Sequence, residues 1–203
     1  MPKKKIKSTF LLTFVAVMIL ELNEVLLPGE PQTLSLMAEE GKLTCLTGGS
    51  ASRLTRWLHA ILGFLPIAHG FISIDGEPLT DATAMAFRKM MSFAPSALEA
   101  QGDVKRYDPP SVQHIFYLKA NRERPISNGI LAEEMRRVGG DAADQRCRLV
   151  AVAALLDKKI MLLDQPPVTS AAYLQRLAAQ GRIVLAATNE TPLLQVADKV
   201  VEL

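Results

Sequence analysis

Apolar and polar residues follow two different periods along this chain. Residues 18–25 alternate apolar and polar side chains, which predicts a half-exposed strand. Apolar residues also recur at helical spacing, at Trp57, Leu58, Ile61 and Leu62. Strands alternating with helices predict an α/β fold, a mixed sheet flanked by helices. Further strands are expected at 32–38 and 71–74, and buried apolar strands from Leu43, at 160–163 and at 182–190.

A loop of small residues joins the predicted strand at Leu43 to the next helix. When such a loop leads into a helix, its backbone N–H groups and the helix dipole favour a phosphate group. The phosphate-loop pattern G-x-x-x-x-G-K-[ST] fits without a gap, although Arg53 replaces its second glycine and Leu54 its lysine. An ordinary strand-to-helix turn is the alternative interpretation. The candidate nucleotide-binding residues are Gly48, Gly49, Ser50, Ala51, Ser52, Arg53, Leu54 and Thr55.

Three further motifs follow this loop. The helix closes at Gly63, and the next strand ends in an Asp-Gly turn. Residues 151–166 are predicted to form a helix and then an apolar strand that ends in Asp-Gln-Pro. Residues 197–203 carry the last of these motifs. This order resembles the ATP-binding cassette (ABC) ATPases, whose pattern "a-x-a-l-l-x-d-x-k-i-l-l-L-D-E-P" fits 151–166 without a gap. The resemblance implies an ABC-type P-loop NTPase fold over 18–203, with a small helical subdomain at about 97–139.

The resemblance also implies roles for single residues. ATP and Mg²⁺ are the implied cofactors, with Thr55 and Asp164 as Mg²⁺ ligands. Gln165 stands where the family has a glutamate as general base, and Asn189 where it has a histidine. Because an amide cannot accept the proton of water and Leu54 carries no charge, we expect hydrolysis to be lost. A helix-terminal hydroxyl at Thr55 and a turn-capping carboxylate at Asp164 are the structural alternatives.

Two more family motifs can be placed on the chain. The signature L-S-G-G-Q falls on 140–144, which puts Asp141 at the serine and a carboxylate opposite a phosphate. In a second register, the glycine pair 139–140 is the signature pair and an insertion follows it. Residues 87–95 resemble the strand that leads into the Q-loop, with Ser96 at the glutamine position.

Composition limits the class of protein. The 203 residues, 49% of them hydrophobic, suffice for one domain with a buried core. A net charge of +2 with intermixed signs argues against nucleic acid as a partner. Cys45 and Cys147 lie far apart in sequence, so we expect buried free thiols in a reducing compartment and no metal cluster.

Residues 1–17 form a basic and apolar N-terminal extension. Its apolar run, residues 10–20, is too short to span a bilayer. Either the extension is loosely attached or Met18 is the true start, and attachment to a membrane through the extension is a further alternative. We expect a cytoplasmic protein, with a peripheral position at the inner face of the membrane as one version of that location.

These substitutions lead to a prediction of function. We expect a degenerate ABC-type domain that binds nucleotide weakly or not at all and does not hydrolyse it. Its implied partner is a membrane permease or a second ABC-type domain, with the helical subdomain as the docking surface. One alternative is an active ATP-hydrolysing subunit that powers transport, with Arg53 in the role of the lysine. Another is a regulatory interaction module without a transporter.

Overall fold

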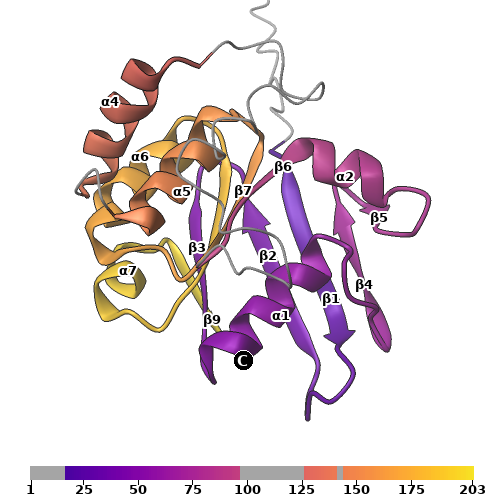
Figure 1. Cartoon of the computed structure of the whole chain (residues 1–203). Helices are drawn as coiled ribbons and strands as arrows, with labels where there is room; N and C mark the ends of the chain where they lie inside the picture. Colours follow the sequence, from indigo (N-terminus) through magenta and orange to yellow (C-terminus); the bar gives the residue numbers. More distant parts are fainter. Residues whose placement is uncertain (1–16, 97–125, 141–143) are drawn as a thin grey trace, which may run out of the picture.

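Two sheets form the framework of the computed structural model, which describes residues 17–96, 126–140 and 144–203 (Figure 1). The larger sheet is parallel and has the order β6 (Met91–Ala94), β7 (Ile160–Asp164), β8 (Ile183–Ala187), β3 (Leu43–Thr47) and β9 (Lys199–Glu202). The smaller sheet is antiparallel and has the order β2 (Leu34–Glu39), β1 (Ile19–Leu26), β4 (His69–Ile74) and β5 (Glu77–Pro78). The predicted α/β fold is confirmed.

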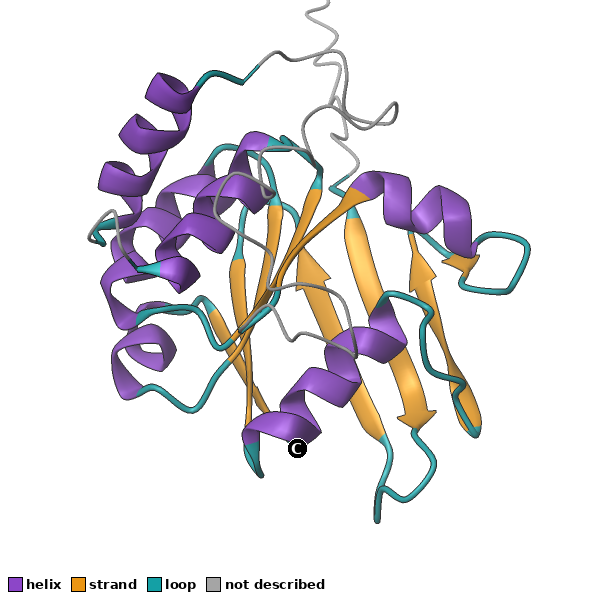
Figure 2. Ribbon diagram, viewed as in Figure 1, coloured by secondary structure: helices purple, strands orange, loops and turns teal. Residues whose placement is uncertain are grey.

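Helices pack on the parallel sheet from both sides, as Figure 2 shows. The helices are α1 (Ala51–Ile61), α2 (Ala84–Met90), α4 (Asn128–Val138), α5 (Gln145–Leu155), α6 (Ala171–Ala179) and α7 (Thr191–Val196). Successive residues of a strand point to opposite faces, so β7 contributes to two cores. Met161 and Leu163 pack with residues of α4 to α7, whereas Ile160 and Leu162 pack with α1 and the antiparallel sheet. This layering fixes the carboxyl ends of β3 and β7 beside the start of α1.

Most predicted strands appear within two residues of their expected bounds, and one assignment is wrong. Residues 87–95 were expected to form a strand, but the first four of them belong to α2. Ala84 and Phe87 lie three residues apart and both are buried, which is the spacing of a helix face. Alanine, methionine, arginine and lysine are also strong helix formers. Only Met91–Ala94 pairs with β7.

Other expectations depend on how much of the chain is described. Residues 1–16 and 97–125, including most of the expected helical subdomain, lie outside the described residues. Its described part is α4, which is capped by the Ser127 hydroxyl. Cys45 and Cys147 are free and buried, as expected. None of the described helices combines the length and apolar character needed to cross a bilayer.

Candidate functional site

The loop after β3 turns sharply into α1. Gly48 and Gly49 have φ angles of 95° and 72°, a left-handed conformation that glycine adopts without strain. Ser50 is the N-cap of α1, and its hydroxyl accepts a hydrogen bond from the Arg53 N–H at 3.3 Å. The first N–H groups of an α-helix have no partner within the helix, and the dipole adds positive partial charge there. The candidate residues from Gly48 to Thr55 therefore span a loop and helix end that attract anions.

The two predicted metal ligands lie in contact beside this loop. Thr55 Oγ1 lies 3.0 Å from Asp164 Oδ1 and 2.9 Å from Oδ2, and Asp164 is only 3% exposed. The same hydroxyl lies 3.0 Å from the Ala51 carbonyl oxygen, so its single proton has three acceptors within reach. Mg²⁺ commonly uses one or two protein oxygens together with water and phosphate oxygens. A hydroxyl and a buried carboxylate at one point therefore fit Mg²⁺.

The residue at the lysine position is part of the core. Leu54 is 0% exposed and packs among residues of α1, the antiparallel sheet and one face of the parallel sheet. Burial of such a side chain stabilises the fold by about 1.5–3 kcal/mol. Leu54 therefore contributes to folding and brings no cation to the loop.

Two arginines of α1 are bound by one buried glutamate. Arg53 Nε lies 2.7 Å from Glu30 Oε2 and Arg56 Nη1 lies 3.2 Å from Oε1, while the Glu30 side chain is 2% exposed. Arg56 also donates a hydrogen bond to the Pro28 carbonyl oxygen at 2.6 Å. A Cβ added to Gly49 would lie 2.8 Å from Arg53 Cδ, so Arg53 crosses the loop at this glycine. Arg53 thus lies on the loop with its guanidinium directed to Glu30.

Glu30 and Arg56 were not among the site residues predicted from the sequence. The sequence offers a weak signal for them, a single acid in the segment between β1 and β2. Its partners lie 23 and 26 residues further along the chain, on the first two turns of a helix. Only the packing of that segment against α1 brings the three charged groups together.

Asn189 ties the end of β8 to the loop. Its Oδ1 accepts hydrogen bonds from the Thr47 hydroxyl and from the Gly48 N–H, both at 3.0 Å. Its Nδ2 donates a hydrogen bond to the Gly49 carbonyl oxygen at 3.0 Å. One amide side chain therefore occupies a loop N–H group and holds the loop backbone in place. It makes these contacts without the charge that a protonated histidine could carry.

Gln165 follows Asp164 directly and retains a polar group at the site. It has a φ of 48°, unusual for a residue with a side chain, and its N–H donates to the Ala187 carbonyl oxygen at 2.9 Å. Its Nε2 is buried and has no hydrogen-bond partner among the described residues. An amide can orient a water molecule but cannot take its proton at neutral pH.

The candidate signature region is described only in part. Asp141 lies outside the described residues. Gly139 ends α4 with a φ of 90°, and a Cβ added to Gly140 would lie 1.9 Å from Cys147 Sγ. Asp144 is the N-cap of α5 and accepts a hydrogen bond from the Cys147 N–H at 3.3 Å. The two glycines and Asp144 therefore have structural roles where α4 leads into α5.

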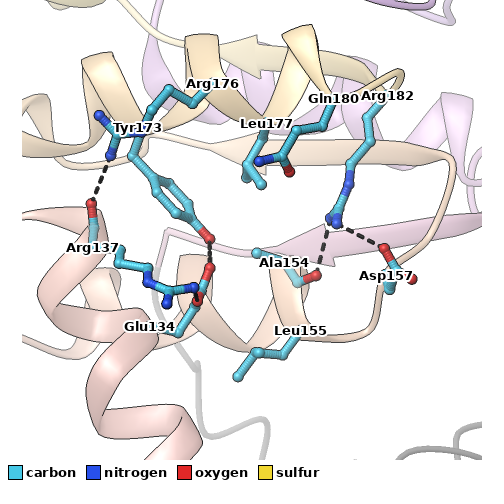
Figure 3. Close-up of a pocket in the computed structure, with 10 residues that line it drawn as sticks. All are labelled: Glu134, Arg137, Ala154, Leu155, Asp157, Tyr173, Arg176, Leu177, Gln180 and Arg182. Carbon is cyan, nitrogen blue, oxygen red and sulfur yellow. Dashed lines mark hydrogen bonds and ion pairs between the residues drawn. The ribbon is translucent and has the colours of Figure 1, made fainter.

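A cavity of about 460 Å³ lies between α4, α5 and α6, and no residue of the loop lines it (Figure 3). Four of its charged groups form ion pairs, Arg137 with Glu134 at 3.2 Å and Arg182 with Asp157 at 2.7 Å, while Arg176 lies over the Tyr173 ring. The Tyr173 hydroxyl donates a hydrogen bond to the Glu134 carboxylate. Burial, together with this carboxylate, raises the pKa of Tyr173. The contact of Tyr173 with Glu134 joins α6 to α4, and Arg182, the residue before β8, is bound to the turn after α5 through Asp157.

A second cavity, of about 360 Å³, is lined mostly by apolar side chains, with Thr80 and Asp81 as polar members. It lies between the end of α1, the strand β4, the turn after β5 and the start of α2. Phe64, which lines it, is 59% exposed, and Met85, which follows the lining residue Ala84 in α2, is 65% exposed. Exposed apolar groups that gather around a hollow are typical of a surface that binds another macromolecule. Further lining residues include Leu65, Pro66, Ile67 and Leu79.

Comparison with known proteins reveals likeness in structure rather than in sequence. No family model matches the chain, and no curated protein does. The fold resembles a bacterial Atm1-family ABC exporter with ATP bound, at 13% identity and a TM-score of 0.70, over 92% of this chain and 37% of the exporter chain. This chain therefore spans little more than a third of that exporter's length.

Two further structural matches cover more of the other chain. A putative ABC transporter ATP-binding protein from Pyrococcus furiosus has 16% identity and a TM-score of 0.70 over 91% of this chain and 97% of its own. The protein cbiO1 from Clostridium perfringens, part of the ABC transporter complex cbiONQ, has 14% identity and a TM-score of 0.64 over 92% and 85%. The chain thus has the fold of ABC-transporter ATP-binding proteins, as its sequence predicted.

Proposed function

From this fold, we propose that the chain is a degenerate ABC-type domain, a non-hydrolysing nucleotide-binding or structural subunit that works beside a membrane transporter. The observation that carries the proposal is the complete burial of Leu54. At this position a phosphate loop uses a lysine to bind the phosphates of the nucleotide. A leucine that forms part of the core cannot replace that charge.

Catalysis of phosphoryl transfer needs cationic groups on the phosphates, a metal ion and a residue that positions or activates water. Loss of a cationic group costs about 10³ in rate, and loss of a general base costs about 10²–10⁴. Together these losses amount to about 10⁵–10⁷ in rate, or about 7–10 kcal/mol in the activation barrier. With Leu54 and Gln165 at the two positions, we infer that ATP hydrolysis is absent.

Weak nucleotide binding remains compatible with the residues that are left. Thr55 and Asp164 would hold Mg²⁺, which supplies charge stabilisation to phosphate oxygens when it is bound. The N–H groups at the start of α1 would donate hydrogen bonds to a phosphate group. Asn189 and Arg53 act against this, because one occupies the Gly48 N–H and the other is paired with Glu30.

The proposed partner is a membrane permease or a second ABC-type domain. The structural neighbours include an ABC exporter and a part of an ABC transporter complex, which supports this choice. The apolar cavity beside Phe64 offers a docking surface in addition to the expected helical subdomain. A subunit with such a partner would lie in the cytoplasm, at the inner face of the membrane.

Two measurements on the purified protein test the proposal. Equilibrium binding of labelled ATP, with and without Mg²⁺, should give weak or no saturation, and phosphate release should not exceed the buffer background. Saturable micromolar binding together with turnover would instead support an active subunit. Arg53→Ala should then abolish the activity, because Arg53 is the cation that crosses the loop.

The partner is tested separately. Copurification of the chain with a membrane protein supports a transporter subunit. Phe64→Asp should weaken that association, because it places a charge in the apolar cavity. Recovery of a folded chain without any membrane protein from its native cells would favour a regulatory interaction module.

A further inference from the structure

We propose that Glu30 is an internal anion that competes with phosphate for the arginines of α1 and thereby keeps phosphate-bearing ligands off the loop. This inference rests on the proposed function, because it concerns the regulation of the same loop. It gives a role to a buried carboxylate that no motif of the sequence identifies.

The contacts of Glu30 are those of a bound anion. Each of its carboxylate oxygens takes one guanidinium, Arg53 at 2.7 Å and Arg56 at 3.2 Å. Guanidinium groups bind carboxylate and phosphate through the same donors, so the two anions compete directly. The Glu30 side chain is 2% exposed, and the Arg53 and Arg56 side chains are 25% and 43% exposed, so water screens the pair with Arg53 less than the pair with Arg56.

The position of Arg53 connects this ion pair to the loop. Gly49 has no side chain, and Arg53 Cδ lies 2.8 Å from where its Cβ would be. The guanidinium therefore lies beside the loop backbone and within reach of an anion bound there. Without the Glu30 charge, the net charge of the side chains of Glu30, Arg53 and Arg56 changes from +1 to +2.

The segment that carries Glu30 is held against α1 by the same groups. Arg56 donates to the Pro28 carbonyl oxygen at 2.6 Å, two residues before Glu30. An anion that displaced the carboxylate would therefore also release the connection between β1 and β2. Exclusion of phosphate from the loop and packing of the β1–β2 connection against α1 therefore depend on the same two arginines.

Glu30→Gln tests the proposal, because the amide keeps the size of the side chain and removes its charge. Pyrophosphate without metal is the probe, and the fluorescence of Trp57 is the signal, since this single tryptophan is buried on α1 one turn after Arg53. We expect binding at least about tenfold tighter than in the unchanged protein, equal to about 1.4 kcal/mol. Calorimetric titration measures the same affinity without relying on the fluorophore.

Glu39→Gln is the matched control. Glu39 pairs with Lys42 at 2.7 Å, so its substitution also removes one negative charge and frees one cation, but before the start of β3 rather than at the loop after its end. We expect its affinity for pyrophosphate to stay within about twofold of the unchanged protein. An equal gain in both variants would overturn the proposal, because it would reflect net charge alone.

Arg53→Gln, added to Glu30→Gln, should cancel the gain if the released guanidinium binds the probe. If Glu30→Gln does not fold, Glu30→Asp serves in its place, because the shorter carboxylate cannot reach both arginines and should give a smaller gain. A folded variant at position 30 that binds pyrophosphate no tighter than the unchanged protein overturns the inference.

The two proposals fail in different ways. Turnover of Mg-ATP by the unchanged protein overturns the proposed function, while the comparison of Glu30→Gln with Glu39→Gln remains valid. If the unchanged protein is inert and Glu30→Gln gains no affinity, only the role of Glu30 is refuted.

Discussion

Removal of the Thr55 hydroxyl should destabilise the protein through Asp164. Thr55→Val keeps the shape of the side chain and has nearly the same helix propensity. Because valine has no hydroxyl, the substitution leaves the Asp164 carboxylate without its donor at 2.9 Å. Asp164 is 3% exposed, and water cannot replace the lost donor fully. A hydrogen bond to a charged group contributes about 1.5–3 kcal/mol. For a domain of this size, that loss lowers Tm by about 3–12 °C.

The assay is thermal and urea unfolding followed by circular dichroism. Thr55→Ser is the control, because it keeps the hydroxyl and should lose no more than about 0.8 kcal/mol for one methyl group. Asp164→Asn in the Thr55→Val background should recover part of the loss, since it removes the charge left without a donor. Equal stability of the valine and serine variants would refute the contact as a stabilising one.

Three further predictions concern the loop and the core behind it. Gly49→Ala should lower the free energy of unfolding by roughly 1–2 kcal/mol because of its φ of 72°, and by a further amount because the new Cβ would contact Arg53. Gly41→Ala is the control, since Gly41 has a φ of 87° and open space around it, and urea unfolding should show only the backbone cost there. Leu54→Lys should lower Tm far more than Leu54→Met, which should cost less than about 1.5 kcal/mol, because the ammonium replaces a fully buried group. Equal melting of these two variants would show that position 54 can turn out of the core. Burial raises the pKa of Cys45 from 9.0 to about 12. Its thiol should therefore react with a disulfide reagent at about pH 8 only after unfolding. The stability that the bound proton contributes should fall as the pH rises from 9.0 towards 12, because the unfolded thiol ionises first. Rapid labelling of the folded protein would contradict that burial.

Hydrophobic periodicity predicted the framework well because each strand faces a defined environment. The alternation of β1 matches an antiparallel strand with one buried face, and the apolar run of β7 matches a strand buried on both faces. Thr55 and Asp164 meet as the motif order suggests, because α1 starts beside the end of β7. Local pattern located the loop, the family resemblance named Thr55 and Asp164, and the structure brings these two side chains into contact; their role as Mg²⁺ ligands stays a prediction.

Side-chain contacts between distant segments could not be predicted in the same way. Glu30 reaches Arg53, and Asn189 reaches Gly48 across 141 residues, through packing that no local pattern encodes. The boundary of α2 was missed because the family's strand pattern was laid over the whole of residues 87–95, although the first four of them belong to the helix. Short apolar runs fit a helix and a strand equally well until their partners are known.

The last strand places residue 203 next to the loop. The Leu203 N–H donates to the Thr47 carbonyl oxygen at 2.9 Å, and a Cβ on Gly48 would lie 3.2 Å from the Leu203 nitrogen. In Figure 1 the C mark accordingly stands beside the first turn of α1. A fluorescent reporter joined after Leu203 would sense ligands that reach this turn. An affinity handle at that point would crowd the turn, so immobilisation is better made through an exposed side chain of α4, such as Glu133.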